Sequence, residues 1–203
     1  MMDLIIDTVK KLQTLLKESG CEDSGVDLDV RTNIVNCQFE RGVCMTALFG
    51  GRSADFITWD PIRAKTKISF MFDAPLDTPS VRGAAAAIIN VAAGFFCLSR
   101  ILHSCPESSH KECQRQLLEE LKGKKIFCGS GPEIETAFRG ADVVTSPQDA
   151  DVILITGKEI IEQGTGTMIL NYKNTKRILC IGPSTAGIAR LNQIEHWCPF
   201  GTC

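Results

Sequence analysis

The sequence predicts an α/β protein with two parts. An N-terminal α+β domain is expected at residues 1–121, and a small Rossmann-like domain with a parallel sheet and a cysteine-containing tail at residues 122–203. Two observations carry this prediction: the first part mixes helical periodicity with strand-like alternation, and short apolar runs alternate with short helical segments after Gly123. Strands separated by short helices imply a parallel sheet with right-handed crossovers.

The first part begins with an amphipathic helix. Residues 4–19 carry apolar side chains at near-helical spacing, with lysines on the other face, and Gly20 is a stop signal. Residues 26–49 then alternate apolar and polar side chains and contain a turn at 40–42, which predicts an antiparallel hairpin or meander. Residues 57–63, with Trp59 and Pro61, are expected to form an irregular loop.

The rest of the first part is expected to be mainly helical. Residues 67–72 predict one more strand, closed by a proline-rich segment. Residues 82–102 are apolar on most helical faces, which predicts a long helix buried between layers. Residues 103–111 are polar and contain Pro106, so the helix breaks there and another helix is expected over 112–121.

The second part is organised around residues 176–187. Ile178 to Ile181 is a short apolar run that predicts a buried parallel strand, and the turn after it offers Ser184 or Thr185 as a helix cap. Further strands are expected in 124–129, 141–144 and 149–157, with a short helix from Glu133 and a helix or loop over 164–172. Ligands of open α/β sheets bind beyond the carboxyl ends of such strands. The turn at 182–185 is therefore the first candidate site, with a plain strand-to-helix connection as the alternative.

Composition disfavours several classes of partner. The chain has 203 residues, 44% of them hydrophobic and 23% charged, and a formal net charge of -2. Its basic clusters are short, so we expect no nucleic acid partner. The longest apolar stretch, residues 83–98, contains Asn90 and falls short of the roughly 20 residues that cross a bilayer. With an amphipathic opening segment in place of a signal peptide, we expect a cytoplasmic protein without a membrane partner; assembly of identical copies is left open.

The cysteines are expected to be free thiols. There are ten of them, without a CxxC motif or a standard zinc or ferredoxin spacing. Cytosolic conditions keep thiols reduced, and a free cysteine in an apolar run packs as a small hydrophobic side chain.

Three turns of the second part carry a resemblance to a known family. In order, the motifs LKGKKI, DADVILITG, QGT and IGPST make the chain similar to the heavy-metal chelation domain family, in which a Rossmann-like domain follows an enolase-N-terminal-like domain. The resemblance implies a ligand in the cleft between the domains and a role in heavy-metal chelation or anaerobic cobalamin synthesis. Carried over by position, the cleft would be lined by Gly129, Ser130, Gly131, Pro132, Glu135, Thr156, Gly157, Gly164, Thr165, Gly182, Pro183, Ser184 and Thr185.

The chemistry of these turns suits an anion. Their glycines permit close backbone approach and their hydroxyls can donate, as a phosphate, a carboxylate or a nucleotide-like cofactor requires. No complete GxGxxG fingerprint is present, because Gly129-Ser130-Gly131 is followed directly by proline. Ordinary turns remain the alternative to a binding site.

Two clusters of histidine and cysteine are candidates for metal binding. His196, Cys198 and Cys203 in the C-terminal tail offer imidazole and thiolate ligands, which suit a transition metal or a metal-containing cofactor. The alternative is a structural tail anchored by Trp197 and Phe200. The second cluster contains His103, Cys105, His110 and Cys113. It has enough ligands for a tetrahedral site, and its alternative is a polar loop between helices.

The leading hypothesis is binding of a small anionic ligand or a metal-containing cofactor in an inter-domain cleft, in heavy-metal chelation or anaerobic cofactor metabolism. One alternative is a transferase that acts on a cofactor precursor with a nucleotide-like cosubstrate. Another is a non-catalytic, thiol-rich interaction protein. The residues do not identify the ligand, the metal or a reaction.

Overall fold

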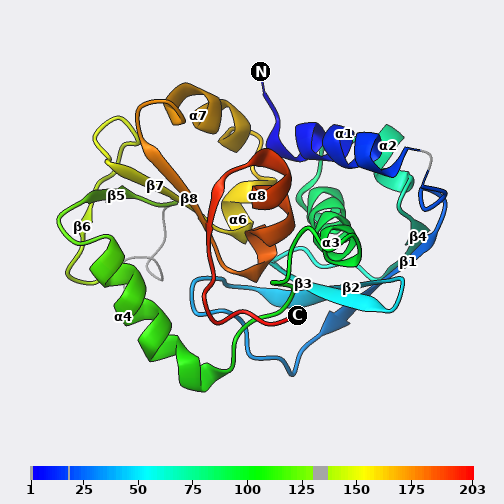
Figure 1. The fold of residues 1–203 in the computed structure, drawn as a ribbon, viewed down its shortest axis with the longest axis horizontal. Coiled ribbons are helices and arrows are strands. Elements are labelled where there is room, and N and C mark those ends of the chain that lie inside the picture. The colour runs from blue at the N-terminus through cyan, green and yellow to red at the C-terminus, as the bar shows by residue number, and fades with distance from the viewer. Residues whose placement is uncertain (1, 18, 130–136) are drawn as a thin grey trace.

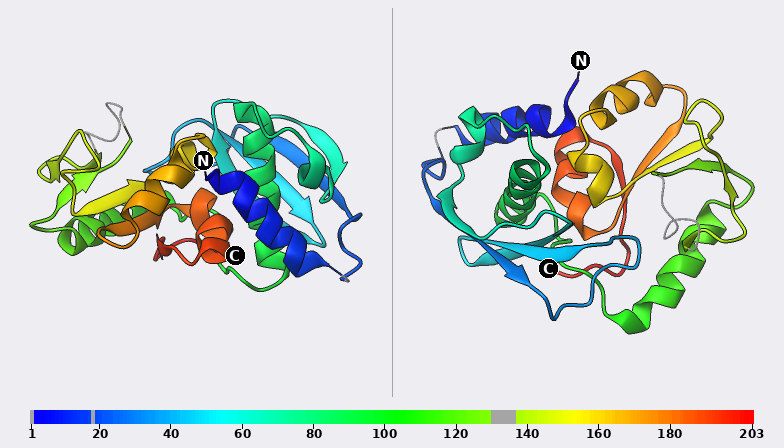
Figure 2. Two further views of the ribbon diagram at one scale, coloured as in Figure 1. Left: turned by 90° about the horizontal axis from the view of Figure 1, so that it is seen from above. Right: turned by 180° about the vertical axis from the view of Figure 1, so that it is seen from behind.

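The computed structural model describes residues 2–17, 19–129 and 137–203. It contains a four-stranded antiparallel sheet and a five-stranded parallel sheet. Figures 1 and 2 show the parallel sheet on one side of the molecule and the antiparallel sheet on the other, with helices α3, α6 and α8 between them. The predicted α/β class, with one sheet of each kind, is confirmed.

The first half contains α1 (Leu4–Leu16), β1 (Gly25–Arg31), β2 (Val43–Phe49), β3 (Arg52–Thr58) and β4 (Ala64–Lys67). The strand order is β3-β2-β1-β4, and all neighbours are antiparallel. The predicted pairing within residues 26–49 is therefore confirmed. Strand β3 extends to Thr58, so the irregular loop begins later than predicted.

The strand predicted over residues 67–72 is wrong in most of its length. Strands β1 and β4 are antiparallel, and Lys67 lies opposite Gly25, the first residue of β1. Because β1 offers no partner beyond Gly25, the chain leaves the sheet after Lys67. The amide of Ile68 then donates to the carbonyl of Ser24, and the short helix α2 (Phe70–Asp73) follows. The apolar run there packs as one helical turn against the core.

Helix α3 (Pro79–Phe95) is the buried helix between the layers. Thr78 is its N-cap and Pro79 its first residue, so it begins earlier than the predicted residue 82. It ends before the predicted residue 102, because Cys97 adopts φ 57° and the amides of Leu98 and Ser99 fold back onto the carbonyl of Ala93. Every residue from Arg82 to Gly94 is buried, which confirms the predicted burial.

The second half contains η1 (Glu107–Ser109), α4 (His110–Glu120), β5 (Lys125–Phe127), β6 (Asp142–Val143), β7 (Val152–Ile155), α6 (Gly157–Ile161), α7 (Thr165–Tyr172), β8 (Arg177–Ile181), η2 (Pro183–Thr185), α8 (Ala186–Asn192) and β9 (Glu195–Trp197). The strand order is β6-β5-β7-β8-β9, all parallel, as predicted. The edge strand β9 was expected to be part of a tail. The short helix predicted from Glu133 begins outside the described residues.

One hydrophobic core runs through both halves. It joins α1, the inner face of the antiparallel sheet and α3 to apolar residues of β7, β8 and α8, such as Ile153, Cys180 and Ile188. A second core lies between α4 and the parallel sheet, and includes Cys113, Leu117 and Leu154. The domain boundary near residue 121 stays a prediction. Within the described ranges, none of the helices combines the length and the apolar character needed to cross a membrane.

Candidate ligand-binding site

The turns after β5, β7 and β8 lie together at the carboxyl edge of the parallel sheet. A Cβ atom on Gly129 would collide with the carboxylate of Glu159, which also accepts a hydrogen bond from the amide of Thr156 at 2.9 Å. A Cβ atom on Gly157 would lie 2.8 Å from the Cβ of Ser184. The structure thus brings together these members of the predicted set, as expected for parallel strands.

A carboxylic acid that the sequence analysis did not single out lies at the centre of these turns. Glu40, from the loop before β2, is only 4% exposed. A Cβ atom on Gly157 would lie 3.0 Å from its Oε1, and one on Gly182 would lie 2.9 Å from its Cδ. Gly182 has φ 85°, which favours glycine. The absence of side chains at both positions therefore makes room for Glu40.

The environment of Glu40 favours its neutral form. Burial raises its pKa from 4.5 to about 8; the hydroxyl and amide of Ser184 and the amide of Gly157 act in the opposite direction, and Asp55 adds to the rise. Within the part of the chain that the structure describes, neither carboxyl oxygen has a hydrogen bond of good geometry. Glu40 is thus a buried acid that holds its proton near neutral pH.

The turn after β8 is closed by the first half of the chain. The hydroxyl of Ser184 accepts a hydrogen bond from the amide of Ile57 at 2.9 Å. Asn90 of α3 donates to the carbonyl of Ser184 at 2.8 Å and accepts from the amide of Gly187 at 2.9 Å. Pro183, Ser184 and Thr185 are all buried. Their polar groups hold the two halves together, so the turn is not an open cradle in this structure.

The other predicted cleft residues differ in their positions. Gly164 is an exposed residue before α7, and the buried hydroxyl of Thr165 donates to the carbonyl of Glu159. Ser130, Gly131, Pro132 and Glu135 lie outside the described residues.

The predicted metal ligands of the tail also have other partners. His196 lies within hydrogen-bonding distance of the carbonyl of Gly182, 2.9 Å from its Nε2, and burial lowers its pKa. Burial raises the pKa of Cys198 to about 12, whereas Cys203 is exposed. Over residues 2–17, 19–129 and 137–203, no three His, Cys, Asp or Glu side chains are grouped to hold a metal ion. This holds for the second cluster as well, in which His103 pairs with Asp55.

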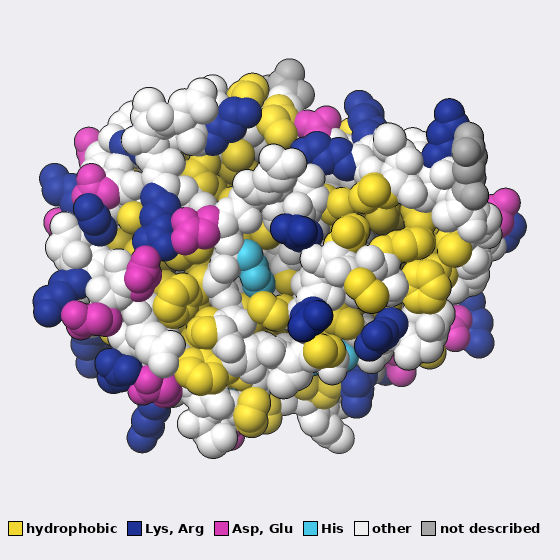
Figure 3. Space-filling model, in the orientation of Figure 1, with side chains coloured by type: hydrophobic (Ala, Val, Ile, Leu, Met, Phe, Trp, Pro, Cys, Tyr) yellow, Lys and Arg dark blue, Asp and Glu magenta, His cyan; other side chains and the backbone are white. Residues whose placement is uncertain are grey.

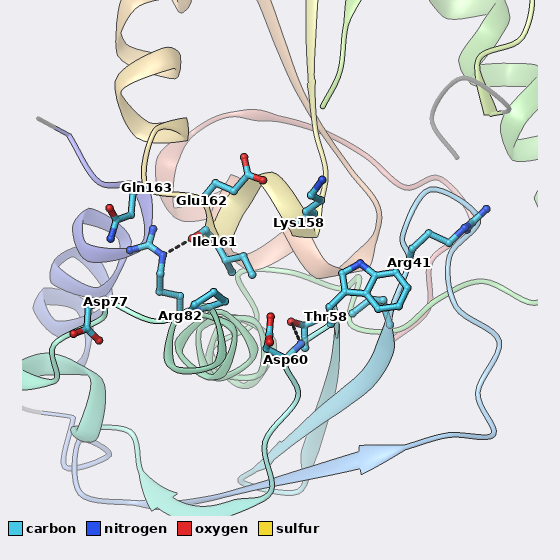
Figure 4. Close-up of a pocket in the computed structure, with 12 residues that line it drawn as sticks. Arg41, Thr58, Asp60, Asp77, Arg82, Lys158, Ile161, Glu162 and Gln163 are labelled. Atoms are coloured by element: carbon cyan, nitrogen blue, oxygen red, sulfur yellow. Dashed lines mark hydrogen bonds between the residues drawn. The ribbon is translucent and has the colours of Figure 1, made fainter. Parts of the chain in front are cut away.

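An open pocket of about 470 Å³ lies next to the turns that surround Glu40, where the two halves meet. Its lining comes from the loop before β2, the end of β3, the start of α3 and helix α6: Arg41, Ile57, Thr58, Trp59, Asp60, Asp77, Pro79, Arg82, Lys158, Ile161, Glu162 and Gln163. Figure 4 shows Lys158 on α6 and Glu162 directly after it, with Thr58 and Asp60 below them in this view. Its volume is typical of a site for a small molecule.

Two cations and one aromatic ring are available in this pocket. Arg41 donates to the carbonyls of Gln38 and Glu40 at 2.9 and 3.1 Å, which orients its guanidinium. Lys158 directly follows Gly157 in the predicted turn. Neither makes an ion pair within the described residues. Trp59 is 65% exposed, an unusual position for such a large apolar side chain.

The remaining charges of the pocket are less available. Arg82 is buried and bound by Asp3, at 2.8 and 3.0 Å, and by backbone carbonyls. Its role is therefore structural. Burial and the nearby Glu159 raise the pKa of Glu162. The face seen in Figure 3 carries both basic and acidic side chains.

Sequence reasoning missed the buried acid Glu40 and the three pocket residues Arg41, Trp59 and Lys158. Glu40 and Arg41 were assigned only to a turn, and Trp59 only to a loop. Lys158 could have been found, because it follows a predicted site glycine and begins a helix. No local pattern marks Glu40 as buried, since its burial depends on turns more than a hundred residues away.

Comparisons with known proteins find solved structures that share the fold, and they show similarity of fold alone. No family model matches the sequence, and no curated protein matches it significantly. A DUF364 family protein of unknown function from Pyrococcus horikoshii superposes with a TM-score of 0.50 at 13% identity, over 89% of this chain and 79% of that one. A DUF364 family protein of unknown function from Desulfitobacterium hafniense gives 0.49 at 14% identity, over 81% and 74%. The first of these solved structures shows that the α/β architecture found here also occurs in that family.

Proposed function

We propose that the protein binds a small anionic ligand with a planar aromatic part in the pocket lined by Trp59, Arg41 and Lys158. The observation that carries the proposal is the pocket itself, a cavity of about 470 Å³ at the junction of the two halves. It combines an exposed indole with two basic groups that form no ion pair among the described residues.

The chemistry of the three side chains is complementary to such a ligand. The indole face of Trp59 offers stacking area, and a guanidinium such as that of Arg41 binds carboxylate or phosphate with two donors. Lys158 adds a point charge on the other half of the chain. A ligand bound to both cations would bridge the two halves, at a pocket whose lining residues differ from the turn residues expected from the sequence.

The family resemblance extends the proposal to a metal-containing ligand. Asp60 and Asp77 also line this pocket, and either carboxylate can contact a metal that the ligand itself already holds. The role in heavy-metal chelation or anaerobic cofactor metabolism, and the enolase-N-terminal-like description of the first half, are parts of this proposal.

The experiment is a fluorescence titration of Trp197→Phe, which leaves Trp59 as the one tryptophan of a chain with two. The probes are ATP, S-adenosylmethionine and a polycarboxylate tetrapyrrole such as uroporphyrin. A hydrogen bond to a charged group contributes roughly 1.5–3 kcal/mol, so Arg41→Ala or Lys158→Ala should weaken binding by about tenfold to a hundredfold. Arg52→Ala, at an exposed position of β3, is the matched control and should not change the affinity.

Saturable quenching that Arg41→Ala and Lys158→Ala weaken, and Arg52→Ala does not, supports the site. Absence of binding for all three probes, or equal affinity in all variants, contradicts it. Equilibrium dialysis against Co²⁺ and Ni²⁺, with and without the bound probe, then tests the metal-containing ligand. Metal uptake that depends on the probe supports that extension.

A further inference from the structure

A second arrangement of polar side chains lies outside this pocket, on the antiparallel sheet. The hydroxyl of Ser53 lies 3.2 Å from Nε2 of His103. Nδ1 of the same imidazole lies 2.9 Å from Oδ2 of Asp55. The other oxygen of Asp55 accepts a hydrogen bond from the hydroxyl of Thr46 at 2.8 Å. A serine, a histidine and an aspartate thus form one continuous hydrogen-bonded chain.

The fold holds this chain of groups in place from two directions. Ser53 and Asp55 are two residues apart on β3, so their side chains project from the same face of the sheet. The amide of Asp55 donates to the carbonyl of Leu102, which fixes the segment that carries His103 along the sheet edge. Thr202 then exchanges backbone hydrogen bonds with His103 from the other side. The imidazole therefore has little freedom to rotate away.

The buried carboxylate sets the tautomer of the histidine. Asp55 is 3% exposed; burial alone would raise its pKa, but hydrogen bonds from His103 and Thr46 hold the pKa below its ordinary value. An ionised carboxylate only accepts, so the proton of a neutral His103 must lie on Nδ1. Nε2 then carries the lone pair and can accept the proton of Ser53. The sequence of hydrogen bonds from the Asp55 carboxylate through the His103 imidazole to the Ser53 hydroxyl is the arrangement that activates a serine as a nucleophile.

The serine is accessible from a groove of about 680 Å³ on this face. The groove is lined by Asp27, Leu28, Asp29, Arg31, Thr46, Leu48, Ser53, Arg63, Ala64 and Lys65. Leu48 lies opposite Ser53 in the strand register and is 48% exposed. Asp29 binds Arg63 at 2.9 Å and Asp27 lies 3.8 Å from Lys65. Arg31 has no such ion-pair partner among residues 2–17, 19–129 and 137–203.

The alternation of backbone amides along β3 also places a hydrogen-bond donor, the amide of Ser53, next to the Ser53 hydroxyl. The amides of Asp55 and Ile57 both point away from β2, towards Leu102 and Ser184. By the same alternation the amide of Ser53 points off this edge of the sheet. It can therefore donate to an oxygen that becomes negative next to the serine hydroxyl.

We propose that Ser53, His103 and Asp55 form a site for acyl transfer from small esters. Ser53 is the nucleophile, His103 the general base and Asp55 the residue that positions the imidazole. An apolar part of the substrate contacts Leu48, and a carboxylate or phosphate group on it pairs with Arg31. This activity is independent of the ligand pocket around Trp59.

The reaction balances with water as the co-reactant. The Ser53 oxygen bonds to the ester carbonyl carbon while its proton moves to Nε2 of His103. The bond to the alcohol oxygen breaks, and His103 returns the proton to the departing alcohol. Water then attacks the acyl-serine, again with His103 as base, and releases the acid and the free hydroxyl of Ser53.

The experiment is covalent labelling with a fluorophosphonate, in which the serine oxygen bonds to phosphorus and fluoride leaves, together with hydrolysis of p-nitrophenyl butyrate. We expect one labelled peptide, containing Ser53. Ser53→Ala should abolish the labelling, and His103→Ala should slow it by about a hundredfold or more. Ser146→Ala is the matched control, because the hydroxyl of Ser146 pairs with Gln148 instead of a histidine, and it should label at the wild-type rate.

Two further variants separate catalysis from structure. His103→Gln keeps a donor for Asp55 but has no basic nitrogen, so it should be as slow as His103→Ala while unfolding at the wild-type urea concentration. The labelling rate of the wild type should rise with pH, and this rise should disappear in His103→Gln. Label on other serines at equal rates, undiminished rates in His103→Gln or no labelling of the folded wild type would overturn the proposal.

Discussion

The pH dependence of stability should be set largely by Glu40, and Glu40→Gln is the substitution that shows it. The pKa of this buried carboxyl rises from 4.5 to about 8 on folding. Between these two values the folded state binds a proton that the unfolded state has released, so stability falls as pH rises. At roughly 1.4 kcal/mol per pH unit, the full cost at pH 8 is about 5 kcal/mol. Below pH 4.5 both states are protonated and the cost disappears.

Glutamine is a neutral residue of similar size, so it removes the titration and keeps the packing. We expect the free energy of unfolding of Glu40→Gln to be close to that of the wild type near pH 5 and to exceed it by several kcal/mol at pH 8. Urea unfolding followed by circular dichroism over this pH range measures the difference.

Glu107→Gln, at an exposed position, is the matched control and should change the free energy by less than about 0.5 kcal/mol throughout. A difference between Glu40→Gln and wild type that stays constant from pH 5 to pH 8 would refute the reasoning. In that case the carboxyl would have the same proton affinity in both states.

Two further substitutions test how the halves are joined. Asn90→Ala leaves the carbonyl of Ser184 and the amide of Gly187 buried without partners, so unfolding by urea should show a loss of about 2–4 kcal/mol; a loss below 1 kcal/mol would contradict the role of this side chain. Gly182→Ala combines a left-handed backbone with a clash against the buried glutamate, whereas Gly123→Ala changes a left-handed glycine with open space around it. Gly182→Ala should therefore lower the free energy of unfolding by clearly more than the roughly 1–2 kcal/mol expected for Gly123→Ala. Equal decreases in the two variants would show that the contact with Glu40 relaxes without cost.

Much of the architecture could be predicted because it depends on local patterns. Strand alternation in 26–49, helical periodicity in 4–19 and short apolar runs after Gly123 each correspond to elements of the structure. The errors lie where tertiary contacts decide the outcome. The segment 67–72 is as apolar as a strand, but its partner strand has ended, so the chain turns into α2.

The candidate sites divide in the same way. The convergence of Gly129, Gly157 and Gly182 could be predicted, because parallel strands end at one edge of a sheet. That a carboxyl group from the other half lies among these glycines could not be predicted, since Glu40 has no local signature. The Ser53, His103 and Asp55 chain was missed for the same reason, since His103 is fifty residues from Ser53 and was singled out as a candidate metal ligand.

By itself, the sequence determined the class of the protein, many of its helices and strands, and the glycine turns at the edge of its parallel sheet, because periodicity and turn chemistry act between neighbours in the chain. The tertiary structure decided which side chains come together: Glu40 among the turns, Trp59 and Lys158 in the lining of one pocket, and Ser53 against His103. These contacts join segments that are distant in sequence, and the packing of α3 and α8 between the two sheets creates the burial that gives those groups their chemistry.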